Sequence, residues 1–368
     1  MRDGVGIELI SLLDVSPAQL VAWCLLAARA VEPNPFFEPA FVLAAARRAG
    51  AQRGALLVVE RRGEWLACLP VQPRGAPPFG ALQTWWHPYC FLGTPLVDRE
   101  RVDEGITALL CAARDRNRFL ALQLVGLDGP VAAAVDRAVA AEGLQIVHDG
   151  RFERACVVRR PGEPRLDLPA KDRRRRMRRL EEQLGQVVVR DRSGDPEAVE
   201  QFLDLEAAGW KGEIETALVS NPADAKFFRE MCAGFADAGR LRMLELRGDS
   251  AEPIAMYCDV AAGDAVFAFK IAFDARYRAS GPGIELLTRV VEDFGERSGE
   301  RLLDSCAASD SDLANGLMPD RRELASRVIG PTGARSDLAR RAASAATAMR
   351  RRREARGHAH QSRPSPAG

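Results

Sequence analysis

One order of elements occurs twice along this chain of 368 residues. The first copy begins with the apolar stretch at residues 7–13, and hydrophobic spacing then predicts two helices, a meander of strands, a helix and a strand. The second copy begins at residues 187–189 and ends on the apolar stretch LLDSC, residues 302–306. This alternation predicts an α/β (α+β) fold with two similar halves. In each half we expect a mixed, mainly antiparallel sheet flanked by helices.

The join between the halves and the charge of the C-terminal end divide the chain further. Residues 159–172 are rich in proline and charge, which is typical of a linker. Residues 332–368 contain nine arginines and two acidic residues, whereas the whole chain carries a net charge of +1. We therefore predict an N-terminal domain at 1–160, a C-terminal domain at 171–330 and a basic helical or disordered tail at 331–368.

Cysteines and histidines bear on the compartment and on metal chemistry. The eight cysteines are scattered without a CxxC pair, and several lie in apolar runs, which favours reduced thiols in a cytoplasmic protein. Only His87 and His148 precede the tail, so we expect no metal site. The longest uncharged stretch, residues 15–28, is shorter than the ~20 residues of a membrane-spanning helix, and the N-terminus has no secretory pattern. We expect no transmembrane segment, and the sequence leaves the oligomeric state open.

The most informative segment for chemistry is FKIAFDARYRASGPGIELL, residues 269–287. An apolar strand runs into a loop with Gly281 and Gly283, and the loop opens directly into an amphipathic helix. The first turn of a helix presents unpaired N–H groups and the positive end of the helix dipole, so it can bind phosphate. Glycines let the backbone approach such a ligand, and Pro282 suits a first helical turn. The segment predicts a phosphate-binding turn, although glycine before a helix also serves in simple turns.

The position of this turn, after the third strand of a meander and before a helix and a strand, resembles the GNAT acyltransferase fold. More narrowly, the C-terminal half is similar to the CelD-like branch, which is related to the Fem-type peptidoglycan ligases. The similarity rests on the order of KDRRRRMRRLEEQLG, LDLEAAGWKG, FKIAFDARYRASGPG and DSCAASD, and on NPFFEPAF and LGTPLVD in the first half. It covers nearly the whole chain and is strongest over residues 171–322. The first half has no comparable turn, so we expect one cofactor site per chain.

The resemblance implies that acetyl-CoA or another acyl-CoA is the cosubstrate, with its pyrophosphate on the turn and the following helix. The residues implied to bind it are Ala279, Ser280, Gly281, Pro282, Gly283, Ile284 and, in the preceding strand, Lys270. For Lys270, a side chain that points to solvent is the simpler alternative.

The chain departs from the family pattern at two points. Gly281 stands where the family usually has the serine of Ser-Pro-Gly, which removes a hydroxyl group. Many GNAT enzymes also place a tyrosine after the last core strand to protonate the departing CoA thiolate. The tyrosines here are Tyr89, Tyr257 and Tyr277, none of which follows that strand. Cys306 or a water molecule is left for this role, unless the thiolate leaves unprotonated.

Direct acyl transfer requires an uncharged amine, a polarised thioester carbonyl and a proton acceptor. Backbone N–H groups of strand 265–272 are expected to polarise the carbonyl. Asp304, at the end of a buried strand, and Glu206, on an amphipathic helix, are the candidate bases. Their alternative roles are a capping aspartate and an ion-pair partner of Lys211 or an arginine.

The acceptor pocket is predicted from polar and aromatic residues near these carboxylates. The candidates are Trp210, Lys211, Asp259, Asp310 and Arg321. Core packing for the tryptophan and surface positions for the charged residues are the alternatives. Kinship with polysaccharide and cell-envelope proteins suggests an acceptor amine on a small metabolite or a precursor of that kind, by analogy alone.

Three other functions stay open. The basic runs at 171–179 and 350–353 would attract nucleic acid or an anionic surface, but no aromatic residues interleave with them, and we expect no specific nucleic acid. A Fem-type ligase would take its acyl group from aminoacyl-tRNA, although the long helical arm of those ligases is not evident. A scaffold that kept the fold without the chemistry is the third, because of Gly281 and the missing tyrosine.

Overall fold

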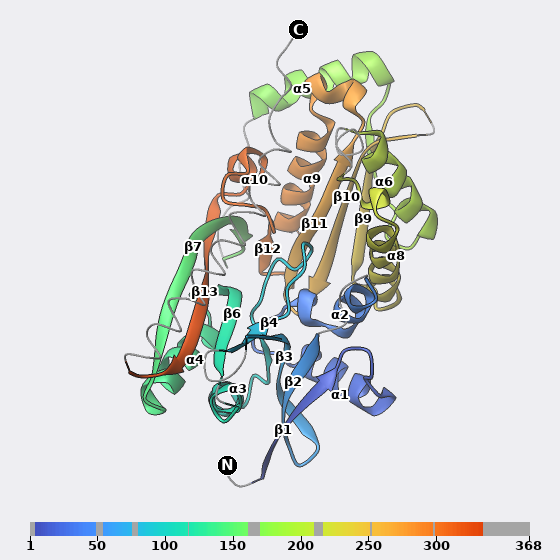
Figure 1. Cartoon of the computed structure of the whole chain (residues 1–368). Helices are drawn as coiled ribbons and strands as arrows, with labels where there is room; N and C mark the ends of the chain where they lie inside the picture. Colours follow the sequence, from blue (N-terminus) through green and yellow to red (C-terminus); the bar gives the residue numbers. More distant parts are fainter. Residues whose placement is uncertain are drawn as a thin grey trace. The chain divides into compact units, whose positions relative to one another are not determined.

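The structure is a computed structural model, drawn in Figure 1. Its contacts divide the chain into two compact units, described here one at a time. The first unit contains Met1–Ala46, Gly50–Phe152 and Glu323–Gly368, and the second contains Arg47–Ala49 and Glu153–Arg322. The residues that the structure describes are 4–48, 54–75, 80–116, 118–160, 170–209, 216–250, 252–296 and 299–333.

The first unit is a sheet with helices. Its strands are β1 (Val5–Ser11), β2 (Ala55–Arg61), β3 (Glu64–Arg74), β4 (Ala81–Thr84), β5 (Leu96–Val97), β6 (Phe119–Gly126) and the end of β13 (Asp320–Pro331). Its helices are α1 (Pro17–Ala28), η1 (Pro35–Phe37), α2 (Pro39–Ala46), α3 (Val102–Arg114) and α4 (Pro130–Ala141). The strand order is β1-β2-β3-β4-β6-β13, with β5 beside β3. Only β4 and β6 pair in parallel; the other neighbours are antiparallel.

Two local features of the first unit follow from its sequence. The Ser16 side chain accepts a hydrogen bond from the Gln19 backbone N–H while the Gln19 side chain bonds back to Ser16, so a capping box begins α1. The hairpin of β2 and β3 turns at Arg62 and Gly63, both with left-handed backbone at φ 55° and 83°. Two such residues match the twist of a tight hairpin.

The second unit repeats the arrangement. Its strands are the end of β7 (Leu144–Val158), β8 (Val188–Asp191), β9 (Leu241–Arg247), β10 (Pro253–Ala262), β11 (Ala265–Phe273) and β12 (Leu302–Asp304). Its helices are α5 (Ala170–Leu184), α6 (Pro196–Ala208), η2 (Leu218–Ser220), α8 (Pro222–Asp237), η3 (Ala275–Ser280), α9 (Pro282–Glu296) and α10 (Asp312–Leu317). The strand order is β7-β12-β11-β10-β9-β8, and only β11 and β12 pair in parallel.

The predicted fold class is confirmed. Each unit runs from a strand through two helices into three antiparallel strands, then a helix, a parallel strand and a further helix. The predicted limits at residues 160 and 171 stay a prediction. The tail predicted at 331–368 lies, from residue 334 onward, outside the described residues.

Each sheet ends on a strand that comes from the other half of the sequence. Cys156, near the end of β7, pairs with Asp304 of β12 in the second unit. Val328 of β13, the last described strand, pairs with Ala121 of β6 in the first unit. The predicted division at residue 160 assigns β7 to the N-terminal half, because strand signals are local whereas pairing partners are set by the whole fold.

Helices cover both faces of the second unit's sheet (Figure 1). From α9, the side chains of Leu286, Val290 and Phe294 are fully buried against β9, β10 and β11. On the other face, Phe228 of α8 stacks on Phe269 of β11 with ring centroids 6.0 Å apart. Within the described part of the chain, no helix is both long and apolar enough to cross a membrane.

Candidate functional site

Strands β11 and β12 part from each other in the middle of the second unit's sheet. Their parallel pairing begins at Ala265–Leu302 and ends at Phe267–Asp304. Beyond that pair, residues 268–273 of β11 are bonded to β10 on one edge, and no described strand pairs with their other edge. Backbone groups must find a hydrogen-bond partner, so this edge can offer N–H groups to a ligand in the opening.

A bulge lies at the start of the opening. Asp259 of β10 pairs with Ala268 and the preceding Cys258 pairs with Lys270, which leaves Phe269 as an extra residue in β11. A bulge breaks the regular ladder and redirects the backbone and the next side chains. The sequence predicted this strand as the source of N–H groups but contained no signal for the bulge.

The predicted phosphate turn follows β11 directly. Gly281 ends η3 in the left-handed conformation, at φ 62° and ψ 48°, and Pro282 begins α9. A serine at position 281 would be strained there, which gives a physical reason for the departure from Ser-Pro-Gly. A Cβ atom at Gly283 would lie 3.2 Å from the Phe273 ring, so this position is also tight. The N–H groups of Gly283 and Ile284 belong to the first helical turn, which lacks intrahelical acceptors.

Helix α5 packs beside this turn, a placement that the sequence analysis missed. A Cβ atom at Gly281 would lie 3.0 Å from Cδ of Arg176, so the arginine stem passes over the turn. The Ser280 hydroxyl donates to Oε1 of Gln183 at 3.4 Å. Leu180 of α5 is fully buried in the core. Leu180, an apolar residue at helical spacing within the basic run, was the available sign that this helix packs on the core. The many arginines of the run favour an exposed helix instead.

The one acidic residue in the first turn of α9 is neutralised. Glu285 is fully buried, and its Oε1 lies 3.1 Å from Nη2 of Arg173 and 3.0 Å from Nε of Arg289. Arg173 also pairs with Glu292, two helical turns further along α9. The carboxylate therefore does not cancel the positive field of the helix N-terminus.

Asp304, a predicted base, lies in a buried ion cluster. The side chain is fully buried, with one oxygen 3.1 Å from Nη1 of Arg322 and the other 3.5 Å from Nη1 of Arg154. It also accepts the backbone N–H of Cys306 at 2.8 Å. Burial acts to raise the pKa of this carboxyl, but the two guanidinium groups and the hydrogen bonds outweigh it and leave the pKa below its ordinary value. A carboxylate held in this way is a weak proton acceptor.

Cys306 follows that cluster in a constrained conformation. Its φ of 51° is left-handed, which a non-glycine residue rarely adopts. Burial, and then the charge of Asp304, raises the pKa of its thiol well above the ordinary value. Burial, and then the charge of Asp259, likewise raises the pKa of the Tyr257 hydroxyl on β10. Both groups therefore hold their protons at neutral pH.

Glu206 and Lys270 come together on the α6 side of the sheet. Nζ of Lys270 lies 2.9 Å from Oε1 of Glu206, and the other oxygen of Glu206 accepts the Leu218 backbone N–H at 2.8 Å. The Glu206 side chain is 1% exposed and the Lys270 side chain 14% exposed. The bulge at Phe269 turns Lys270 toward this face, so its ammonium group contacts a carboxylate from α6.

The residues predicted to bind the acceptor are spread over different surroundings. Asp259 is buried and forms an ion pair with Arg242 at 2.6 Å. Asp310 is exposed in the segment after β12, and Nη1 of Arg321 donates to the carbonyl oxygens of Met318 and Asp320. Trp210 and Lys211 lie outside the described residues.

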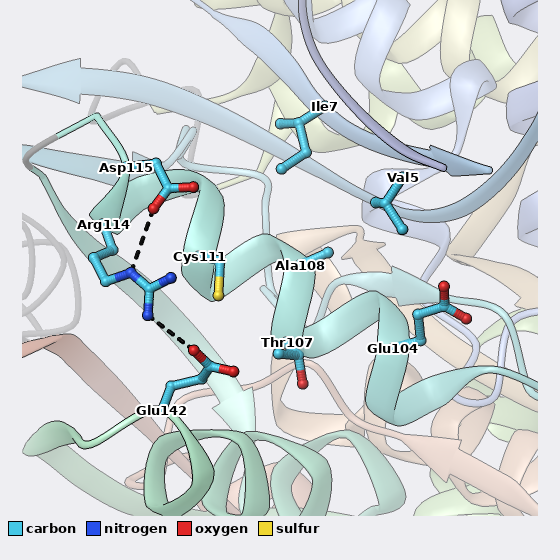
Figure 2. A pocket seen from close by; sticks show the side chains of 9 residues that line it. All are labelled: Val5, Ile7, Glu104, Thr107, Ala108, Cys111, Arg114, Asp115 and Glu142. Atoms are coloured by element: carbon cyan, nitrogen blue, oxygen red, sulfur yellow. Dashed lines mark hydrogen bonds and ion pairs between the residues drawn. The ribbon is translucent and has the colours of Figure 1, made fainter. Parts of the chain in front are cut away.

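The first unit contains a separate cavity of about 160 Å³ between β1 and α3 (Figure 2). Val5 and Ile7 face α3 there, and Arg114 lies between the carboxylates of Asp115 and Glu142. Burial raises the pKa of the Cys111 thiol in its wall. The arginine is already paired and the thiol is protonated, so this cavity presents no activated group. No cluster of potential metal ligands occurs among the residues the structure describes.

Comparison with protein families identifies part of the chain. Residues 170–311 match the model of the acetyltransferase (GNAT) domain. This segment contains α5, the opening between β11 and β12, and the Gly281 turn. Comparison with curated proteins gives no significant match.

Solved structures share the fold over most of the chain at low identity. FemX is 11% identical, with a TM-score of 0.55, over 84% of this chain and 95% of that one. The C-terminal domain of a putative lysylphosphatidylglycerol synthetase from Agrobacterium fabrum is 14% identical, with a TM-score of 0.54, over 87% and 94%. L-PGS from Bacillus licheniformis is 10% identical, with a TM-score of 0.54, over 88% and 95%. The chain therefore has a GNAT-like fold.

Proposed function

We propose that this protein is an acyl-CoA-dependent N-acyltransferase that moves an acyl group, in the first instance acetyl, to an amine. The observation that carries the proposal is the parting of β11 from β12 directly before the Gly281 turn, within the segment that matches the GNAT acetyltransferase model. An opening beside a strand edge that no described strand pairs with, and with a helix N-terminus at one end, suits a thioester joined to phosphates. The acyl-CoA would supply the activated carbonyl group.

The cofactor residues of the proposal are those of the turn. The N–H groups of Gly283 and Ile284 would donate to the pyrophosphate, helped by the dipole of the 15-residue helix α9. Ala279, Ser280 and the left-handed Gly281 shape the approach, and Pro282 begins the helix without adding a donor. Lys270 leaves this set, because its ammonium group is bound to Glu206.

The chemistry joins the acceptor nitrogen to the carbonyl carbon and breaks the carbon–sulfur bond. Backbone N–H groups of β11 beyond its pairing with β12 would stabilise negative charge on the carbonyl oxygen. The amine proton must pass to a base, and the sulfur leaves as a thiolate. Cys306 is buried and lies against Asp304, so we propose that the thiolate leaves unprotonated and takes its proton from solvent after release.

We assign the base to Glu206 and a positioning role to Asp304. We choose Glu206 for its position, because it lies four residues before Trp210 and five before Lys211, our proposed acceptor residues. Its ion pair with Lys270 would have to open for it to take the amine proton. Asp304 is committed to two guanidinium groups at the other side of the opening.

The remaining acceptor candidates are proposed as outer contacts. Exposed Asp310 and Arg321 could meet a polar acceptor after β12, whereas Asp259, already paired with Arg242, would act from behind the site. By analogy with the CelD-like branch, we propose a small metabolite or a polysaccharide or cell-envelope precursor as the acceptor. The cytoplasm is the proposed compartment, because the eight cysteines are free.

Ligand-dependent thermal unfolding tests the proposal. CoA, acetyl-CoA or a longer acyl-CoA at a hundred times its Kd should stabilise the fold by about 2.7 kcal/mol. At 2–4 °C per kcal/mol, the midpoint of the second unit should rise by roughly 5–11 °C. Gly283→Glu, which adds bulk and negative charge at the turn, should abolish the rise. Gly295→Glu, on the same helix with nothing within 4 Å of its Cβ position, is the matched control and should keep it.

Aminoacyl-tRNA is the second candidate acyl donor, and the likeness to FemX favours it. A folded wild-type protein that shows no rise with any CoA species, but binds aminoacyl-tRNA, would replace our first proposal with this one. Tight CoA binding without release of free thiol toward a panel of amines would instead indicate a non-catalytic scaffold.

A further inference from the structure

We propose that Arg176 of α5 binds a phosphate group of the cosubstrate at the Gly281 turn. The proposal rests on the proposed function, because it assumes that a phosphate-bearing acyl donor occupies the turn. It assigns a specificity-determining role to a helix that lies 97 residues before the turn in the sequence, counted from Gln183 to Ser280.

The flank of α5 that faces the turn is defined by two contacts. Arg176 passes over Gly281, with Cδ 3.0 Å from the place a Cβ atom would take. Gln183, two helical turns later on the same side of α5, accepts a hydrogen bond from Ser280. Cδ of Arg176, which bears the guanidinium group, therefore lies beside the residue that precedes α9.

Arg176 has hydrogen-bonding capacity that the described residues do not use. Its Nε is buried and has no acceptor, and no carboxylate of the described chain forms an ion pair with it. Arg173, one turn earlier, is fully committed to Glu285 and Glu292. A buried donor without an acceptor is unfavourable, and a guanidinium fork matches the geometry of phosphate oxygens. An anion at the turn would satisfy it.

Gly281 and Arg176 are complementary in space. A side chain at position 281 would meet the Arg176 stem at 3.0 Å and would have to adopt a left-handed backbone. Because glycine has no side chain, the Arg176 side chain can occupy the space over the turn. A guanidinium group from α5 can thus stand in for the hydroxyl group that Gly281 lacks, with a positive charge in addition.

The test is calorimetric binding of CoA, dephospho-CoA and pantetheine to matched variants of the full chain. Arg176→Met keeps the apolar stem and removes the charge, while Arg175→Met removes an exposed charge from the outer side of the same helix. We expect Arg176→Met to raise the Kd for CoA about 10- to 100-fold and to leave pantetheine binding unchanged. Arg175→Met should change the CoA affinity less than about threefold. Arg176→Lys, which keeps a charge without the fork, should fall between.

Dephospho-CoA identifies the phosphate. A loss shared by CoA and dephospho-CoA assigns Arg176 to the pyrophosphate, and a loss for CoA alone assigns it to the 3′-phosphate; both support the proposal. Equal CoA affinity in Arg176→Met and wild type, or equal losses in Arg176→Met and Arg175→Met, would overturn it. Should Arg176→Met not fold, Arg176→Lys with unchanged CoA affinity would overturn it as well. No CoA binding by wild type is a separate result, which refutes the proposed function itself.

Discussion

Replacing Asp304 by asparagine separates an anchoring role from a catalytic one. Asp304 is fully buried and holds Arg154, Arg322 and the Cys306 N–H together. Asparagine keeps the size but removes the charge, so two guanidinium groups lose their buried counter-ion. Removing one partner of a buried ion pair typically costs about 3–5 kcal/mol.

That cost can be expressed as a shift in the unfolding midpoint. Residues 47–49 and 153–322 make a unit of 173 residues, for which 1 kcal/mol corresponds to about 2–4 °C. Asp304→Asn should therefore lower the midpoint of the second unit by roughly 6–20 °C at pH 7. Asp310→Asn, an exposed aspartate six residues later, is the control and should stay within about 0.5 kcal/mol of wild type.

The pH dependence has a defined sign. The pKa of Asp304 in the folded protein is below its ordinary value. Its ionised form therefore adds stability that is fully present above the unfolded pKa of about 3.9 and is lost as the pH falls through the lower folded pKa. The midpoint difference between wild type and Asp304→Asn should shrink below about pH 4. The assay is thermal unfolding followed by circular dichroism from pH 3 to pH 7.

Turnover of the same variant completes the test. With Asp304 as an anchor, the folded variant well below its midpoint should keep much of its activity. A midpoint within about 2 °C of wild type, combined with a loss of turnover of a hundredfold or more, would refute the anchoring role and restore Asp304 as the base.

Three further outcomes follow from the site. Glu206→Gln should lower the rate of acyl transfer by about 10²–10⁴-fold, while the Kd for acyl-CoA, measured by calorimetry, stays unchanged. A parallel loss of acyl-CoA binding would contradict the role of Glu206 as the base. Gly281→Ala should destabilise the fold by about 1–2 kcal/mol in urea unfolding, because φ 62° is unfavourable for alanine, whereas no change would mean that the turn rearranges freely. Because Cys306 is buried and the pKa of its thiol is raised, it should resist iodoacetamide at pH 7.5 until the protein unfolds, whereas exposed Cys24 should be labelled at once. Mass spectrometry measures both, and early labelling of Cys306 would contradict its burial.

Much of the fold could be predicted because its signals are local. The strand, loop and helix around Gly281 follow from apolar spacing, glycine and Pro282, and the structure has β11, η3 and α9 at those positions. The repeated order of elements was also readable, since each element carries its own periodicity. The left-handed backbone of Gly281 is consistent with a residue type that accepts it.

The chemical properties of the site residues could not be predicted from the sequence, because the residues they contact lie far away along the chain. Asp304 is a weak base only because Arg154, 150 positions earlier, pairs with it together with Arg322. In the sequence, Arg176 resembles the other arginines of its run, and only the packing of α5 beside Gly281 distinguishes it from them. The charge content of a segment does not show which groups its side chains contact. The direction of a pKa shift is set by those contacts, which only the tertiary fold assembles.

The crossed ending of the two sheets has a consequence for how the chain is made. β6 ends at Gly126, but its neighbour β13 begins at Asp320, 194 residues later. At a synthesis rate of about 5–20 residues per second, β6 waits roughly 10–40 s with one edge uncovered. An uncovered strand edge invites pairing with other chains. The newborn protein therefore exposes this edge until β13 has been synthesised, and its yield in cells should depend on what shields that edge during translation.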